Sequence, residues 1–256
     1  RFEINAIPFQ VLRDKTRMEL LHMAANYTRG IKSLLQRSES GSCLYLRNSG
    51  QNDSSWHRTQ DKLSVRGLDL DYEAIKNIPI IQTGHEPIFY YTGVWIKNHL
   101  IQYLASMLGG VGINMIVDND ACNMGFMYVP VLSENPASVR KVAFVKDKNN
   151  VAYEEIVFDD LGTILRFKEE VLGLLKKNIF DEKIKTTIES TQSTFEEFIG
   201  RVVECYQKGC IDMVGLLTSA RCALEEDFLI DNLEVPVSWI CNTEGFYHFL
   251  LHMVYE

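Results

Sequence analysis

The chain has 256 residues, 46% of them hydrophobic, which is enough for a real core in one large domain or a domain with a sizeable insertion. Its net charge of -8, and the lack of a basic cluster rich in aromatic residues, argue against nucleic-acid binding. The sequence contains no apolar run of about 18 residues, so we expect no membrane span. The six cysteines are scattered, with no C-x-x-C pair, which favours a reducing, cytoplasmic setting.

The first predicted elements are a helix and a long loop. Asp14 or Thr16 could cap a helix over residues 15–36, which carries a rough apolar stripe. Residues 37–62 are rich in Ser, Asn, Asp and Gly, a composition typical of a long loop.

Residues 78–120 predict a βαβ unit around which the chain is organised. Residues 78–81 form a short apolar run that ends near Gly84, as a buried strand does. Thr92 can cap a helix that runs to about residue 108 and stops at two glycines. Residues 113–117 form a second buried strand. A crossover helix makes the two strands parallel, and ligands bind beyond the carboxyl ends of such strands.

Polar residues stand at both of these strand ends. They are Thr83, Gly84, His85 and Glu86 after the first strand, and Asp118, Asn119 and Asp120 after the second. His85 could contact a phosphate or act as an acid or base, or it could satisfy backbone groups of the loop. The Asp118-x-Asp120 spacing can hold Mg²⁺ or contact a ribose, but it also suits an Asx turn or a helix cap.

Lys97 is an unusual residue on the predicted crossover helix. At about 100° per residue it projects from the middle of an apolar face. That face consists of Val94, Leu100, Ile101, Leu104, Met107 and Leu108. A lysine in this position snorkels to the edge, pairs with a carboxylate, or contacts a bound anion such as phosphate.

The rest of the chain divides into three parts. A strand at 126–132 and a hairpin of 139–145 with 151–158 extend the sheet or form a flap, completing an α/β core over residues 1–158. Helices at about 161–177, 182–190, 194–208 and 212–231 form a helical subdomain over 159–232, inserted into or appended to that core. Residues 233–256 return to the core and end in a helix capped by Asn242 or Thr243.

The C-terminal helix carries a weaker candidate for a metal site. His248 and His252 are spaced i, i+4, which allows them to share a metal ion, although the full HExxH pattern is absent. The alternative is a polar stripe in which Glu244 contacts the histidines. Because the chain begins at Arg1 and ends inside this apolar helix, we expect it to be part of a longer protein.

The motif TGHEPIFYYTGVWIKN, followed by a strand ending in DND, resembles the bacillithiol-biosynthesis cysteine-adding enzymes (BshC-like cysteine ligases) and their relatives. In that family a T-G-Q-Q loop precedes a T-G-P turn, a long helix with a lysine, and a strand with an acidic end. Thr83 and Gly84 match the first pair, with His85 and Glu86 in place of the glutamines. The second T-G is similar to Thr92 and Gly93, and the remaining matches are Lys97, one helical turn nearer that glycine, and Asp118 with Asp120.

The resemblance covers residues 78–120 well, and it implies an α/β fold with a Rossmann-like parallel-sheet core. It also implies ATP or another nucleotide, with Mg²⁺, bound near Gly84 and His85. The helical block at 160–230 is similar only in kind to the helical insertions of that family.

Three functions follow as hypotheses. The first is a nucleotide-dependent ligase or transferase that joins a small amine or amino acid to an acceptor. Thr83, Gly84, His85, Thr92 and Gly93 would bind the nucleotide, with catalysis by His85, Lys97, Asp118 and Asp120. The second is a metal-dependent transferase or hydrolase using Asp118 and Asp120. The third is a non-catalytic binding or assembly module that forms a homo-oligomer through the helical block.

Overall fold

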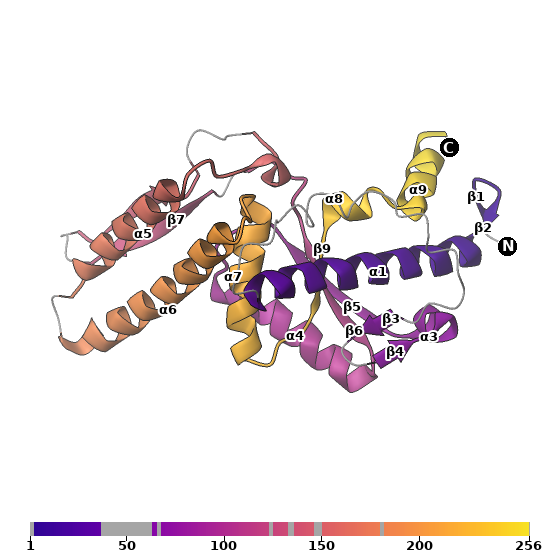
Figure 1. Cartoon of the computed structure of the whole chain (residues 1–256), viewed down its shortest axis with the longest axis horizontal. Helices are drawn as coiled ribbons and strands as arrows, with labels where there is room; N and C mark the ends of the chain where they lie inside the picture. The colour runs from indigo at the N-terminus through magenta and orange to yellow at the C-terminus, as the bar shows by residue number, and fades with distance from the viewer. Residues whose placement is uncertain are drawn as a thin grey trace.

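The computed structural model describes residues 3–36, 63–65, 68–122, 125–132, 136–145, 150–179 and 182–255. It shows a mixed α/β chain with a small parallel sheet flanked by helices (Figure 1). The loop predicted at 37–62 lies outside the described residues. None of the described helices is long and apolar enough to cross a membrane.

The sheet has three parallel strands in the order β5-β6-β9. They are β5 (Ile80–His85), β6 (Val111–Ile116) and β9 (Leu233–Pro236). The crossover from β5 to β6 is α4 (Thr92–Leu108), which ends at Gly109 with a φ of 61°, a left-handed conformation that glycine adopts readily. The predicted βαβ unit is therefore confirmed. The third strand, β9, was not predicted.

Helices cover both faces of this sheet. α1 (Phe9–Gln36) and α3 (Tyr72–Asn77) pack on the face that presents Val111, Ile113 and Val235. Side chains alternate along a strand, so Asn114 and Glu234 point to the opposite face. There they meet α4 and α7 (Met213–Asp227), which makes the second layer partly polar.

A second and larger core lies beside the sheet. It is formed by β7 (Phe126–Val131), β8 (Ser138–Ala143), α5 (Leu161–Lys176), α6 (Glu182–Gln207) and α7. Figure 1 shows α5, β7 and α6 projecting together from one side of the molecule. Phe89 and Phe167 stack inside this core with ring centroids 5.2 Å apart, so the loop after β5 is anchored in it.

The β-hairpin exists, but its predicted partners were wrong. β7 pairs with β8 in an antiparallel register, whereas the segment from residue 151 to 158 contains a short 3₁₀ helix, η2 (Tyr153–Glu155). The buried residues Tyr153 and Ile156 are three apart, a spacing that suits a 3₁₀ turn better than a strand.

Helix boundaries differ from the expectation in several places. α7 ends at Asp227 rather than at residue 231, and Thr92 is the first residue of α4 instead of its cap. α1 begins at Phe9 rather than near residue 15, and α6 is one continuous helix where two were predicted. Thr191 and Thr194 donate hydrogen bonds to the carbonyls four residues earlier, so the Ser- and Thr-rich stretch stays helical. The predicted cap at Thr243 is confirmed, because its Oγ1 accepts a hydrogen bond from the Phe246 N–H at 3.1 Å.

The remaining elements are short pairs and C-terminal helices. They are β1 (Glu3–Ile4), β2 (Ile7–Pro8), β3 (Leu63–Val65), β4 (Leu68–Leu70), α8 (Val237–Ile240) and α9 (Glu244–Tyr255). β1 pairs with β2 and β3 with β4, both antiparallel.

The buried face of α4 is not the one predicted. Val94, Asn98, Ile101 and Ala105 are buried, whereas Leu100 and Met107 of the expected face are exposed. The observed face is rotated by about 80° from the apolar pattern. Asn98 explains the rotation, because it must reach a buried carboxylate on α7. Lys97 consequently lies at the edge of the packed face rather than at its centre.

Two glycine substitutions test this packing. A Cβ on Gly110 would lie 2.4 Å from the Pro79 carbonyl oxygen, so Gly110→Ala should lower the free energy of unfolding by about 1–3 kcal/mol. Gly173 lies in α5, and a Cβ added there would have no atom within 4 Å. Gly173→Ala should therefore raise the free energy of unfolding by about 0.5–1 kcal/mol. Urea unfolding measures both, and equal effects would contradict the strand-end packing.

Candidate functional site

The carboxyl ends of β5, β6 and β9 meet at one edge of the sheet because the strands are parallel. The chain continues from these ends to Glu86, to Asp118 and to Ser238, respectively. The Val117 N–H donates to the His85 carbonyl at 3.0 Å, which extends the β5-β6 ladder past the last strand residues. Candidate site residues from both predicted strand ends are therefore close to one another.

Lys97 points from α4 toward the end of β5. Its Nζ donates a hydrogen bond to the Gly84 carbonyl at 3.3 Å. In the part of the chain that the structure describes, no carboxylate oxygen is within 4.0 Å of this ammonium group. An ammonium group has three donors, so Lys97 can still donate to an anion at the strand end. Thr92 and Gly93 are exposed at the start of the same helix.

His85 is half-buried and is held by its own loop. Its Nδ1 lies 3.4 Å from the Glu86 carbonyl oxygen, and its ring packs edge-on against Tyr90 at 5.5 Å. These contacts fix the direction of the imidazole. They fit the alternative in which His85 satisfies a backbone group of the loop.

The two predicted aspartates have different surroundings. Asp118 is buried and accepts hydrogen bonds from the Ser238 N–H at 2.9 Å and the Ser238 hydroxyl at 2.6 Å. Burial raises its pKa, and the bonds from Ser238 oppose that rise. Asp120 is exposed and accepts a bond from the N–H of Ala121 at 2.7 Å, as in a local turn. The carboxylates of Asp118 and Asp120 therefore bond to different groups and do not face a common ligand position.

Three groups around Asp118 were not predicted from the sequence, namely Ser238, Glu154 and Cys241. Partial burial and then the Asp118 charge raise the pKa of Glu154. Burial, followed by the charges of Asp118 and Glu154, also raises the pKa of the Cys241 thiol. The β-branched residues Val235 and Val237 after a long helix were the signal for a third parallel strand, which would have brought Ser238 to this edge.

The C-terminal histidines lie on α9, away from the strand ends (Figure 1). His248 Nε2 is 3.7 Å from the Glu244 carboxylate, and Lys15 pairs with that same carboxylate. This arrangement is the Glu–His contact considered as the alternative to a metal site. Within the described residues, neither His248 nor His252 joins a cluster of three metal-binding side chains.

A buried ionic cluster lies behind the strand ends, between the sheet and the α4–α7 layer. Arg221 donates to Glu225 and to Glu234, each at 2.6 Å. Asn98 donates to Glu225 at 2.7 Å and Asn114 to Glu234 at 2.9 Å. One guanidinium faces two carboxylates, so it cannot neutralise both of them when both are ionised. Burial raises the pKa of Glu234 to about 7, while Arg221 favours its ionised form.

This cluster is linked to the candidate site through Tyr90. The Arg221 guanidinium lies over the Tyr90 ring, 5.3 Å from its centroid, and the same ring contacts the His85 imidazole edge-on at 5.5 Å. Burial raises the pKa of Tyr90, so the phenol stays protonated at neutral pH. The position of His85 therefore depends on Tyr90 and, through it, on Arg221.

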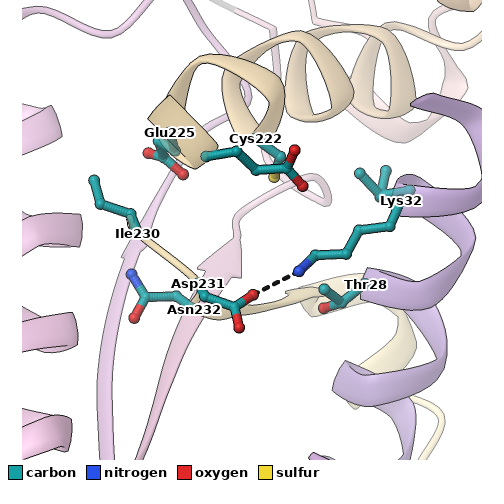
Figure 2. Close-up of a pocket in the computed structure, with 9 residues that line it drawn as sticks. Thr28, Lys32, Cys222, Glu225, Ile230, Asp231 and Asn232 are labelled. Atoms are coloured by element: carbon teal, nitrogen blue, oxygen red, sulfur yellow. Dashed lines mark hydrogen bonds and ion pairs between the residues drawn. The ribbon is translucent and has the colours of Figure 1, made fainter. Parts of the chain in front are cut away.

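A pocket opens beside the cluster, between α1, α7 and the segment before β9 (Figure 2). Figure 2 shows Lys32 reaching from α1 to Asp231, with a distance of 2.6 Å between their charged atoms. Ligand atoms of Cys222, Glu225 and Glu234 lie within 4.8 Å of one another, the one such group among the described residues. Arg221 already occupies the place of a cation between the two carboxylates, so the geometry fits an internal ion network better than a metal centre.

Comparison of the chain with protein families, with curated proteins and with solved structures finds no match. The resemblance of residues 78–120 to the cysteine-adding enzymes therefore stays a prediction.

The Glu234 environment predicts a pH dependence of stability. Its folded pKa of about 7 lies above the ordinary value of 4.5, so the folded chain binds more protons between these pH values. The free energy of unfolding should fall by up to about 3 kcal/mol as pH rises from about 4.5 to about 7, and then level off. Glu234→Gln should remove this fall, measured by urea unfolding at several pH values.

The matched control is Glu226→Gln, because Glu226 is an exposed glutamate on α7, next to Glu225 of the buried cluster. It should keep the dependence seen in the wild-type chain. A Glu234→Gln variant with an unchanged slope would show that other groups cause the effect.

Proposed function

We propose that the chain is a nucleotide-dependent ligase or transferase with a Rossmann-like site at the carboxyl ends of β5, β6 and β9. The observation that carries the proposal is the Lys97 ammonium group. It is half-buried at the strand end, bonded to the Gly84 carbonyl, with no carboxylate within 4.0 Å in the described part of the chain. A cation held in this way suits an anionic ligand, and phosphate is the anion that parallel α/β sheets bind at this edge.

The neighbouring groups suit the two substrates of such a reaction, the nucleotide and the amine. Lys97 would neutralise charge on phosphate oxygens, and the half-buried His85 could donate a hydrogen bond to the same group or to a leaving group. Asp118, fixed by Ser238, could hold the ammonium group of an amine or amino-acid substrate or the Mg²⁺ that accompanies a nucleotide. The nucleotide would activate the acceptor by transferring a phosphoryl or nucleotidyl group to it. The amine nitrogen would then bond to the acceptor as the phosphate or nucleotide leaves with the bonding electron pair, and the amine would lose a proton.

A second candidate is a metal-dependent transferase or hydrolase. The observation in its favour is that the Glu154 N–H donates to the Asp118 carbonyl oxygen at 2.9 Å, which keeps these two acidic residues beside each other. Partial burial, and then the Asp118 charge, raise the pKa of Glu154. In this case Asp118 and Glu154, rather than Asp118 and Asp120, would bind Mg²⁺ or Mn²⁺. The metal would bind without a nucleotide.

The test is thermal unfolding of the purified chain with ATP, ADP, AMP or CTP, each with and without Mg²⁺. A ligand present at about 100 times its dissociation constant should add about 2.7 kcal/mol to the stability of the folded chain. Lys97→Met should abolish the shift, because it removes the cation but keeps a flexible apolar side chain. Lys177→Met, which changes an exposed lysine at the end of α5, should keep it.

The outcomes separate the two candidates. A shift with Mg²⁺ or Mn²⁺ alone that is lost in Asp118→Asn would favour the metal-dependent enzyme. A nucleotide shift that survives in Lys97→Met, or no shift with any nucleotide, would contradict the proposed site.

A further inference from the structure

The outer surface of α4 is an apolar ridge. Ile96, Leu100, Tyr103 and Met107 are spaced i, i+4, i+7 and i+11, so they form a straight line along the helix. Their exposed fractions are 53–66%. This ridge points away from the sheet, opposite the buried side that carries Asn98 and Ala105.

The end of α7 extends the ridge sideways. Phe228 packs against α4, with its ring centroid 6.0 Å from that of Trp95 and 5.9 Å from that of His99. Phe228 is 60% exposed and Leu229 is 85% exposed. We call the combined surface the α4 patch, defined by Ile96, Leu100, Tyr103, Met107, Phe228 and Leu229.

The α4 patch contains no charged side chain. Within α4, Lys97 is the one residue with a formal charge, and it lies on the flank, bonded to Gly84. The neighbouring acidic residues are Glu226 and Asp227, at the end of α7. The neutral centre offers no countercharge to a charged peptide, and the acidic border repels acidic peptides and anionic lipid headgroups.

We propose that the α4 patch binds the same patch of a second copy of this chain. An isologous contact needs a self-complementary surface, and a straight neutral ridge on a helix can pair with itself about a twofold axis. Two chains of net charge -8 repel each other, so a neutral face is where they can approach most closely.

The size of the patch fits a dimer. A large aromatic side chain buries about 150–250 Å² when fully covered. Six large side chains that are mostly exposed therefore supply several hundred Å² per copy. Together with their border they approach the roughly 800 Å² per partner of a stable interface. The proposal does not depend on the nucleotide site.

The experiment measures the mass of the purified chain by light scattering and sedimentation, between roughly 1 and 100 µM. The wild-type chain should have the mass of two chains at the upper concentrations. Leu100→Lys and Tyr103→Lys should halve that mass, because each places a charge in the apolar centre, while thermal unfolding of the monomer shows that both variants are folded. Raising NaCl from about 50 to 500 mM should strengthen the wild-type dimer by screening the repulsion.

Two control variants change exposed apolar residues elsewhere. Tyr128→Lys changes an exposed residue of β7. Leu251→Lys changes an exposed residue of α9, the helix that carries the other strongly apolar surface of the described chain. Both should keep the dimer. A monomer at about 100 µM, or a dimer that Leu251→Lys breaks and Tyr103→Lys does not, would overturn the proposal. So would a monomer that binds phosphatidylcholine–phosphatidylserine vesicles through Tyr103.

Discussion

The guanidinium of Arg221 and its two buried carboxylates fix the arrangement of the elements around the sheet. Arg221 joins α7 to β9 through Glu234, while Asn98 and Asn114 bring α4 and β6 into the same cluster. Losing one partner of a buried ion pair typically costs about 3–5 kcal/mol, because a charge is left without compensation. A shift of β9 by one residue would turn Glu234 onto the apolar α1 face. The cluster therefore selects the register of this strand.

The same register builds the candidate site. Glu234 holds β9 beside β6, and four residues later the chain brings Ser238 within 2.6 Å of the Asp118 carboxylate. On the other side of the sheet edge, Arg221 supports the Tyr90 ring, against which His85 packs. Groups that stabilise the fold thus also orient the groups at the strand ends. A change in the cluster should alter the site even though it lies outside it.

Local patterns could predict the βαβ unit and several helix ends, because their causes lie within a few residues. Gly109 stops α4, and Thr243 caps α9 by bonding three residues ahead. The strand β9 and the buried face of α4 depend on partners far along the chain. Asn98, for example, meets Glu225, 127 residues away. Because apolar side chains cover more than half of the circumference of α4, hydrophobic periodicity could not choose its buried side, and the polar partner of Asn98 did.

α4 therefore presents three surfaces with different chemistry. Asn98 lies on the side buried against the ionic cluster, Lys97 lies on the flank at the strand ends, and Ile96 lies on the outward ridge. Successive residues are separated by about 100° around the helix, so a partner covering the ridge leaves the flank accessible. Dimerisation through the α4 patch and anion binding by Lys97 are accordingly compatible. Rigid pairing of α4 would also hold the Lys97 flank in place, because the same helix backbone carries both surfaces.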